Sequence, residues 1–257
     1  MAQTESFSFY NLENDDLDKP IYRIFPKERL IQMFDEQKNV LVRPGKWEDP
    51  FENFILKSTA MDSEGNKVTF SFHDEYYGQC WTTLKASDAM WRIYSPDRFD
   101  VDGKKLPPNG LRIKTTMRKL ADSLGQPCGK FGPVQSSIGK VRYLKDAELK
   151  DFAKNGLRSA ITGESIAQTL LAKRKAFSHE REIRLIYSDI NNSHSDSDIY
   201  KYKIDPHDLI DQIMLDPRLT PEEAKAVKAE VRSKTKFKGT VKRSFLYTLS
   251  DDLVVNV

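Results

Sequence analysis

Apolar residues alternate with polar ones, or run together, over many strand-length stretches of this chain. Alternation with a period of two is typical of a strand with one buried face, and a short apolar run is typical of a strand buried on both faces. These stretches are residues 21–25, 40–42, 68–72, 111–113, 183–187, 199–204, 213–215 and 241–249. The pattern predicts a protein rich in strands.

Fewer stretches carry apolar residues at helical spacing. The clearest is 220–232, where Thr220 and Glu223 can form a capping box and Pro221 takes the first helical position. Four other helices are predicted, at residues 26–36, 117–124, 146–154 and 164–175.

The order of these elements sets the expected fold class. Strands and helices do not alternate regularly, so a doubly wound parallel sheet is not expected. We predict an α+β fold with mixed or mainly antiparallel sheets and peripheral helices. At 257 residues, and with no linker in the sequence, the chain is expected to form a single domain over residues 1–257, with a flexible N-terminal segment at 1–19.

Composition excludes few classes of function. The 41 Lys and Arg residues and 38 Asp and Glu residues leave a net charge of +3, which does not by itself indicate nucleic-acid binding. No signal peptide or membrane span is recognised, so we expect a cytoplasmic protein. Cys80 and Cys128 have no neighbouring cysteine or histidine at metal-ligand spacing, so neither a disulfide nor a metal site is expected.

The sequence lacks the common nucleotide and hydrolase motifs. It contains neither G-x-x-x-x-G-K-[ST] nor G-x-G-x-x-G, and also no G-x-S-x-G or H-E-x-x-H. These absences argue against P-loop NTPases, dinucleotide-dependent dehydrogenases, α/β-hydrolases and zincin proteases.

The most distinctive local pattern is E-x-E-x-R at residues 180–184. On a strand, Glu180, Glu182 and Arg184 share one face, and the apolar residues that follow can anchor the other face in the core. Two carboxylates on one platform can stabilise a developing positive charge and serve a nucleophile. An ordinary edge strand with Glu182 paired to Arg184 explains the same pattern. On a polar strand surface, Glu182→Gln is expected to cost about 1 kcal/mol or less.

The three tryptophans stand in short upstream motifs, at Trp47, Trp81 and Trp91, with Tyr94 shortly after the last. Aromatic faces can pack on a flat heterocycle such as nicotinamide or adenine. Large aromatic residues also commonly fill cores, so both interpretations stay open here.

Several motifs, in this order, resemble a bacterial family catalogued as a domain of unknown function. They are Tyr22-Arg23, W-x-D-P-F-E at 47–52, Cys80-Trp81-Thr82, M-W-x-x-Y at 90–94, the Lys-rich run 173–175, E-x-E-x-R at 180–184 and D-P-x-x-L-I at 205–210. The resemblance covers roughly residues 21–232. That family in turn looks like the ADP-ribosyltransferases of the Arg, Ser/Thr, Glu type.

The resemblance implies roles for individual residues. Arg23 corresponds to the arginine that holds the dinucleotide, and Thr82, with Thr83 as the alternative, to the middle-strand hydroxyl. Glu180 and Glu182 correspond to the catalytic E-x-E pair. The middle motif departs from the usual Ser-Thr-Ser and is Trp81-Thr82-Thr83.

The same resemblance implies that NAD is consumed as a co-substrate and that no metal is needed. Trp81, Trp91 and Tyr94 are then expected to pack on the bases of NAD. One relative is the toxin of a phage-defence toxin, antitoxin and chaperone system that is thought to ADP-ribosylate messenger RNA. This narrower likeness implies a bacterial toxin, an antitoxin protein as partner, and RNA or protein as acceptor, with RNA favoured.

A basic segment near the C-terminus offers a surface for such an RNA. It holds Lys236, Lys238, Lys242 and Arg243, interleaved with Phe237, Phe245 and Tyr247. Basic residues can follow a phosphate backbone while aromatic rings stack on bases. A strand edge protected by lysines explains the same residues. Two further alternatives stay open: a non-enzymatic module that binds nucleic acid or protein, and NAD hydrolysis without an acceptor.

Overall fold

The computed structural model describes residues 7–47, 59–61, 67–69, 75–124, 136–158, 167–189 and 196–248. Contacts between Cα atoms divide the chain into two compact units. Unit 1 is Met1–Ile21, Lys38–Thr83 and Thr116–Ile204, and unit 2 is Tyr22–Gln37, Leu84–Thr115 and Asp205–Val257. The single domain over residues 1–257 stays a prediction. Of the W-x-D-P-F-E motif, residues 48–52 lie outside the described residues.

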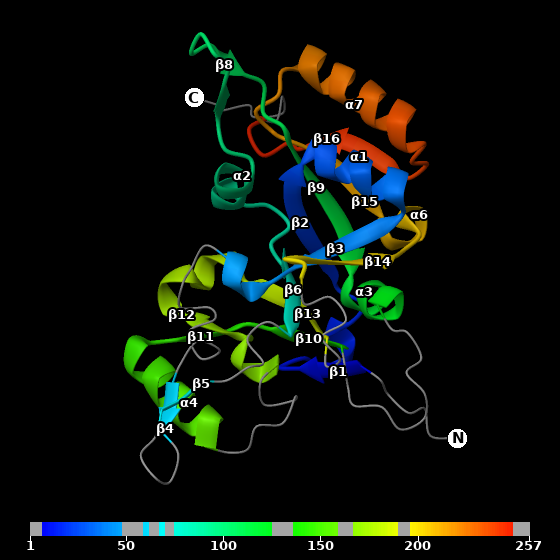
Figure 1. Ribbon diagram of the computed structural model, residues 1–257. Helices are drawn as coiled ribbons and strands as arrows, with labels where there is room; N and C mark the ends of the chain where they lie inside the picture. The colour runs from blue at the N-terminus through cyan, green and yellow to red at the C-terminus, as the bar shows by residue number, and fades with distance from the viewer. Residues whose placement is uncertain are drawn as a thin grey trace, which may run out of the picture. The chain divides into compact units, whose positions relative to one another are not determined.

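Unit 1 is built on a mixed sheet (Figure 1). In order of pairing its strands are β1 (Phe7–Tyr10), β10 (Ser136–Lys140), β13 (Glu182–Ser188), β6 (Tyr76–Thr82), β3 (Lys38–Val42) and β14 (Ile199–Lys203). The first pair is parallel and the others are antiparallel. β1 lies inside the segment 1–19 that was predicted to be flexible. Ile183 and Leu185 are fully buried, as the apolar alternation predicts, and so is Ile138 of β10, the register partner of Leu185.

Unit 1 also holds two short ladders, two longer α-helices and a helical turn at residues 167–169. The ladders are β11 (Arg142–Leu144) with β12 (Ala172–Arg174), and β4 (Thr59–Met61) with β5 (Lys67–Thr69). The helices are α3 (Met117–Leu124) and α4 (Asp146–Arg158), and short 3-10 turns occupy η1 (Asn14–Asp16), η2 (Pro44–Lys46) and η4 (Lys175–Glu180).

Unit 2 holds a second set of strands and helices. β2 (Pro20–Pro26) begins in unit 1 and lies beside β9 (Gly110–Thr116), followed by β15 (Gln212–Leu215) and β16 (Thr240–Arg243). Its helices are α1 (Lys27–Glu36), α2 (Asp88–Tyr94), α6 (Pro206–Leu209) and α7 (Pro221–Thr235), with the small ladder β7 (Arg98–Phe99) and β8 (Lys105–Leu106). α1 and α7 pack on each other (Figure 1). The α+β class with a mixed sheet is thereby confirmed.

The capping signals place α7 as predicted. Thr220 Oγ1 accepts from the Glu223 backbone at 3.2 Å, and Glu223 Oε2 accepts from the Thr220 backbone at 2.8 Å. These two bonds satisfy amide groups that a helix start leaves open. The helix runs on to Thr235 and ends at Lys236 in the left-handed conformation, with φ 54°. The predicted strand 241–249 ends early, at Arg243.

One predicted helix was only partly right, and several elements were missed, among them β1, β6, β10, β11, α2 and α6. The stretch 164–175 was predicted as a helix; residues 167–169 are helical, but residues 172–174 form β12 beside β11, and η4 follows. The Lys-Arg-Lys run at 173–175 was interpreted as a helix C-terminus. In the structure, an ion pair with Glu180 holds its first residue, Lys173. The polar and apolar residues of β6 do not alternate strictly, and α2 is short, so neither element was predicted.

Candidate functional site

The two glutamates of the E-x-E motif reach one point in unit 1 by a route that the sequence did not predict. Glu180 ends η4, Arg181 takes the left-handed conformation at φ 45°, and β13 begins only at Glu182. Glu180 is therefore not on the strand, which corrects the prediction of a shared strand face. The carboxylates still meet, because Lys173 Nζ lies 2.6 Å from Glu180 Oε2 and 3.4 Å from Glu182 Oε2.

Arg184 fixes the second of these carboxylates. Its Nε is 2.9 Å from Glu182 Oε1 and its Nη2 is 3.0 Å from Oε2. The Arg184 side chain is fully buried, its Nη1 donates to the Leu170 carbonyl at 2.6 Å, and its guanidinium carbon lies 4.4 Å from the Trp47 ring centre. Two carboxylates and two cations thus form a buried cluster whose charges balance. It includes the pair of Glu182 with Arg184, which the alternative interpretation of the motif predicted.

The environment keeps Glu182 ionised. Burial alone would raise the pKa of this carboxyl, but the charge and hydrogen bonds of Arg184, the charge of Lys173 and a hydrogen bond from Cys80 outweigh burial and lower the pKa below its ordinary value. A Glu182 carboxylate that is negative at neutral pH can stabilise a positive charge that develops in a bound ligand.

The middle-strand threonine lies beside this motif. Thr82 and Glu182 are register partners on antiparallel β6 and β13. Thr82 Oγ1 donates to the Glu180 carbonyl at 2.5 Å, and the Thr83 backbone donates to the Arg181 carbonyl at 3.1 Å. The two threonines therefore brace the turn from which both glutamates project. The sequence prediction that Thr82 accompanies the E-x-E motif agrees with this geometry.

Trp81 points the other way. Successive side chains on β6 alternate between faces, so Trp81 lies on the face opposite Thr82 and Glu182. Its indole Nε1 donates to Gln79 Oε1 at 2.8 Å, and the ring is buried. This placement favours a core role for Trp81 over contact with a nucleotide held at Glu182.

The remaining predicted NAD-binding residues belong to unit 2. Arg23 on β2 is half-buried, with its guanidinium carbon 5.3 Å from the Phe25 ring centre. Trp91 on α2 is buried in a core cluster with Ile24 and other apolar residues. Tyr94, at the end of α2, is exposed. The buried position of Trp91 favours packing as its role.

The basic segment divides into exposed and structural residues. Lys236, Lys238 and Lys242 are exposed, and Arg243 is half-buried and donates from Nη1 to the Leu219 carbonyl at 2.8 Å. Phe237 is only 2% exposed and packs near Phe34 and His207, so its proposed stacking on a base was wrong. Phe245 is 67% exposed and Tyr247 47%.

Sequence reasoning missed Lys173 and Tyr143 as site residues. They are register partners in the parallel ladder of β11 and β12. Tyr143 Oη accepts from the Glu182 backbone at 2.8 Å. Burial, with the nearby charges of Glu182 and Glu180, raises the pKa of Tyr143 to about 12, so its hydroxyl stays protonated. No local pattern marked Tyr143, and Lys173 stood only in the Lys-rich run 173–175 without a site role, because the ladder joins segments 30 positions apart in the chain.

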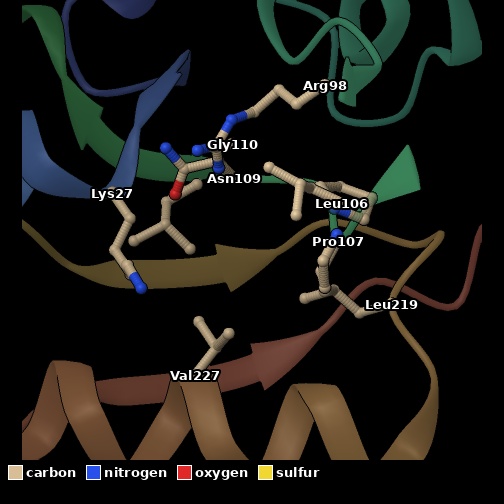
Figure 2. A pocket seen from close by; sticks show the side chains of 10 residues that line it. Lys27, Arg98, Leu106, Pro107, Asn109, Gly110, Leu219 and Val227 are labelled. Carbon is tan, nitrogen blue, oxygen red and sulfur yellow. The ribbon is translucent and has the colours of Figure 1, made fainter. Parts of the chain in front are cut away.

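A cavity of about 260 Å³ opens in unit 2 (Figure 2). Arg23 is not among the residues that line it. Apolar side chains such as Leu106 and Val227 form its walls, and Lys27 and Arg98 stand at it. Lys27 is paired with Glu230 at 2.5 Å. None of the predicted site residues lines this cavity.

Within the described ranges, no group of three or more His, Cys, Asp or Glu side chains is arranged to hold a metal ion. None of the helices in the described part of the chain combines the length and the apolar character that crossing a membrane needs.

Comparisons with known proteins add a distant likeness. No protein-family model matches the chain, and no curated protein matches it. The chain is similar to solved structures of DarT from Thermus sp. 2.9. The complex with NAD+ is 13% identical, with 88% of this chain and 96% of that chain covered and a TM-score of 0.39. For the complex with ADP-ribosylated ssDNA these values are 12%, 88%, 94% and 0.39.

Proposed function

We propose that this protein is an NAD-dependent ADP-ribosyltransferase whose catalytic carboxylates are Glu180 and Glu182. The observation that carries the proposal is the meeting of two motifs about a hundred residues apart: Thr82 donates to the Glu180 carbonyl and pairs in register with Glu182. The motif order that resembles the Arg, Ser/Thr, Glu transferases thus coincides with a local cluster of ionised and hydroxyl side chains.

In the proposed reaction, the bond between C1′ of the nicotinamide ribose and the nicotinamide nitrogen breaks, and its electron pair leaves with nicotinamide. The sugar passes through an oxocarbenium-like state, which a nearby carboxylate stabilises. Glu182 accepts a hydrogen bond from a ribose hydroxyl, since a carboxylate held by Arg184 still has free lone pairs. The acceptor's nucleophilic atom then bonds to C1′ and loses its proton.

Glu180 is the carboxylate proposed to orient the acceptor and take that proton. Lys173 occupies its Oε2, while Oε1 has no hydrogen-bond partner in the described part of the chain. One oxygen therefore remains available for a ligand. By the resemblance, Arg23 binds the pyrophosphate of NAD, and Tyr94 offers an exposed ring for a base. Thr83 supports the turn through its bond to Arg181.

The proposed acceptor is a macromolecule, with RNA favoured over protein, and the proposed biological role is that of a bacterial toxin or phage-defence effector held in check by an antitoxin protein. Three exposed lysines, Lys236, Lys238 and Lys242, support a phosphate-binding surface. The lysine-protected edge of β16 remains the alternative explanation for them.

Nicotinamide release from NAD, measured first without an acceptor and then with cellular RNA or with cellular protein, tests the proposal. Release that increases with RNA and labels it supports RNA as acceptor. Release without any labelling points to NAD hydrolysis. No release under any condition favours the non-enzymatic binding module. Glu222→Gln, an exposed change on α7, is the matched control and should behave as the parent.

A further inference from the structure

Arg112, on β9 in unit 2, is a buried arginine with no acidic partner among the residues that the structure describes. The residue is only 5% exposed to solvent. Nη1 donates to the Lys85 carbonyl, whereas Nε is buried and has no acceptor within the described ranges. Buried charges in proteins are ordinarily paired, because an isolated one is costly. An unpaired guanidinium in this position calls for a counter-charge.

The surroundings hold the guanidinium in a fixed plane. Its carbon lies 4.6 Å from the ring centre of Tyr22 on β2. Met214 on β15 is its register partner and belongs to the apolar cluster that includes Trp91 of α2. Arg112, Tyr22 and Met214 therefore share the face of unit 2 that α2 covers.

This face is not the one that Arg23 occupies. Because neighbouring residues of a strand point to opposite faces, the contact of Tyr22 with Arg112 sends Arg23 to the other side of β2. Any ligand group held by Arg112 is distinct from one held by Arg23.

The hydrogen-bonding pattern leaves one edge of the guanidinium open. Nη1 is taken by a carbonyl, and the remaining donors, Nε and Nη2, form the side that binds two oxygens of one planar or tetrahedral oxyanion. Stacking on Tyr22 limits rotation of the group, so this donor pair is arranged in advance. Burial lowers the pKa of Arg112 below its ordinary value, which an arriving anion would reverse.

We propose that Arg112 is the recognition residue of an oxyanion site on the α2 face of unit 2, which takes a phosphoryl or carboxylate group through Nε and Nη2. The site uses neither Glu180 nor Glu182, and it stands whether or not the chain cleaves NAD. Nε lies below the surface, so the ligand displaces part of its cover on binding.

Thermal melting and titration calorimetry of the full chain with sodium pyrophosphate, and separately with sodium acetate, test this site at matched ionic strength. The parent should melt at a higher temperature with one of the probes, and the effective probe identifies the oxyanion as phosphoryl or carboxylate. Arg112→Met should weaken binding by about tenfold to a hundredfold, the loss of a charge-assisted pair of bonds. Arg112→Lys keeps the charge without the paired donors and should fall between. Arg29→Met removes an exposed arginine of α1 in the same unit, and this control should bind the probe as the parent does.

The melting temperature without a probe separates a ligand site from a structural tether. An unpaired buried charge replaced by an apolar side chain of similar length should leave the melting temperature unchanged or raise it. If Arg112→Met instead melts lower and still binds the probe, the arginine only ties β9 to the Lys85 carbonyl, and the proposal is overturned. A parent protein that neither probe stabilises overturns it equally.

Discussion

Arg184 binds both carboxylate oxygens of Glu182, with Nε 2.9 Å from Oε1 and Nη2 3.0 Å from Oε2. The arginine is fully buried, so Glu182 is both the proposed catalytic carboxylate and the main counter-charge of an arginine in the core. A substitution at Glu182 is therefore expected to change both the activity and the free energy of unfolding.

Glu182→Gln should abolish nicotinamide release and also destabilise the fold. The amide removes the negative charge that an oxocarbenium-like state needs. It also leaves Arg184 without its main partner, and breaking a buried pair in this way costs about 3–5 kcal/mol. This replaces the cost of about 1 kcal/mol or less that a polar strand surface predicted. Nicotinamide release and urea unfolding measure the two effects separately.

The double variant Glu182→Gln with Arg184→Met serves as the control for stability. It removes both charges, and it should recover part of the lost free energy of unfolding while remaining inactive. A folded Glu182→Gln protein that cleaves NAD at the parental rate would rule out the proposed role of Glu182.

Glu180→Gln should impair transfer to the acceptor more than cleavage of NAD. Its proposed partner is the nucleophile, and its Oε1 is the oxygen without a partner in the described residues. The destabilisation should be smaller than for Glu182→Gln, because Glu180 contacts Lys173 through one oxygen and Lys173 keeps Glu182 nearby. Acceptor labelling and nicotinamide release are compared for each variant. Equal losses in both assays would remove the division of labour between the two glutamates.

Tyr143→Phe should reduce NAD cleavage by about tenfold while keeping the fold, since a lost hydrogen bond near a charged group is worth roughly 1.5 kcal/mol. The hydroxyl that accepts from the Glu182 backbone helps to set where β13 begins. Tyr202→Phe is a matched control in the same unit, because its hydroxyl accepts from Asn39 at 2.8 Å, apart from the glutamates. The control should lose stability without losing activity. Activity of Tyr143→Phe equal to that of the parent contradicts the prediction.

Acid should destabilise the protein partly through Glu182. Its pKa is lower in the folded chain than in the unfolded chain. The stabilisation is therefore complete above the unfolded pKa of about 4.3 and is lost as the pH falls through the lower folded value. The free energy of unfolding, measured in urea from neutral pH down to about pH 3, should fall less steeply for Glu182→Gln than for the parent. Parallel curves for the two proteins would show that Glu182 does not contribute.

Charge reversal of Lys236, Lys238 and Lys242 should abolish binding of RNA, if the basic segment holds it. Binding by the parent should weaken steeply with salt, because neutralised phosphates release counterions. Filter binding at several salt concentrations measures both effects. Lys201→Glu, on β14 in unit 1, is a control that changes charge elsewhere. RNA binding that survives the triple reversal leaves the lysines as protection for the edge of β16.

The sequence by itself determined the local structure where its signals were strong. Apolar alternation located β2, β9, β13 and β15, and the capping residues of α7 fixed its start, because these signals lie within a few neighbouring positions. The E-x-E-x-R motif and the threonines at 82 and 83 were marked as candidates for the same reason.

Only the tertiary structure decided how those residues meet. A left-handed turn at Arg181 takes Glu180 off the strand, and Lys173, from a predicted helix that is a strand, joins the two carboxylates. The burial of Arg184, and that of an Arg112 guanidinium with no acidic partner among the described residues, depend on what covers them from distant segments. The cost of a buried charge is set by surroundings assembled from across the chain, and no local pattern of residues records it.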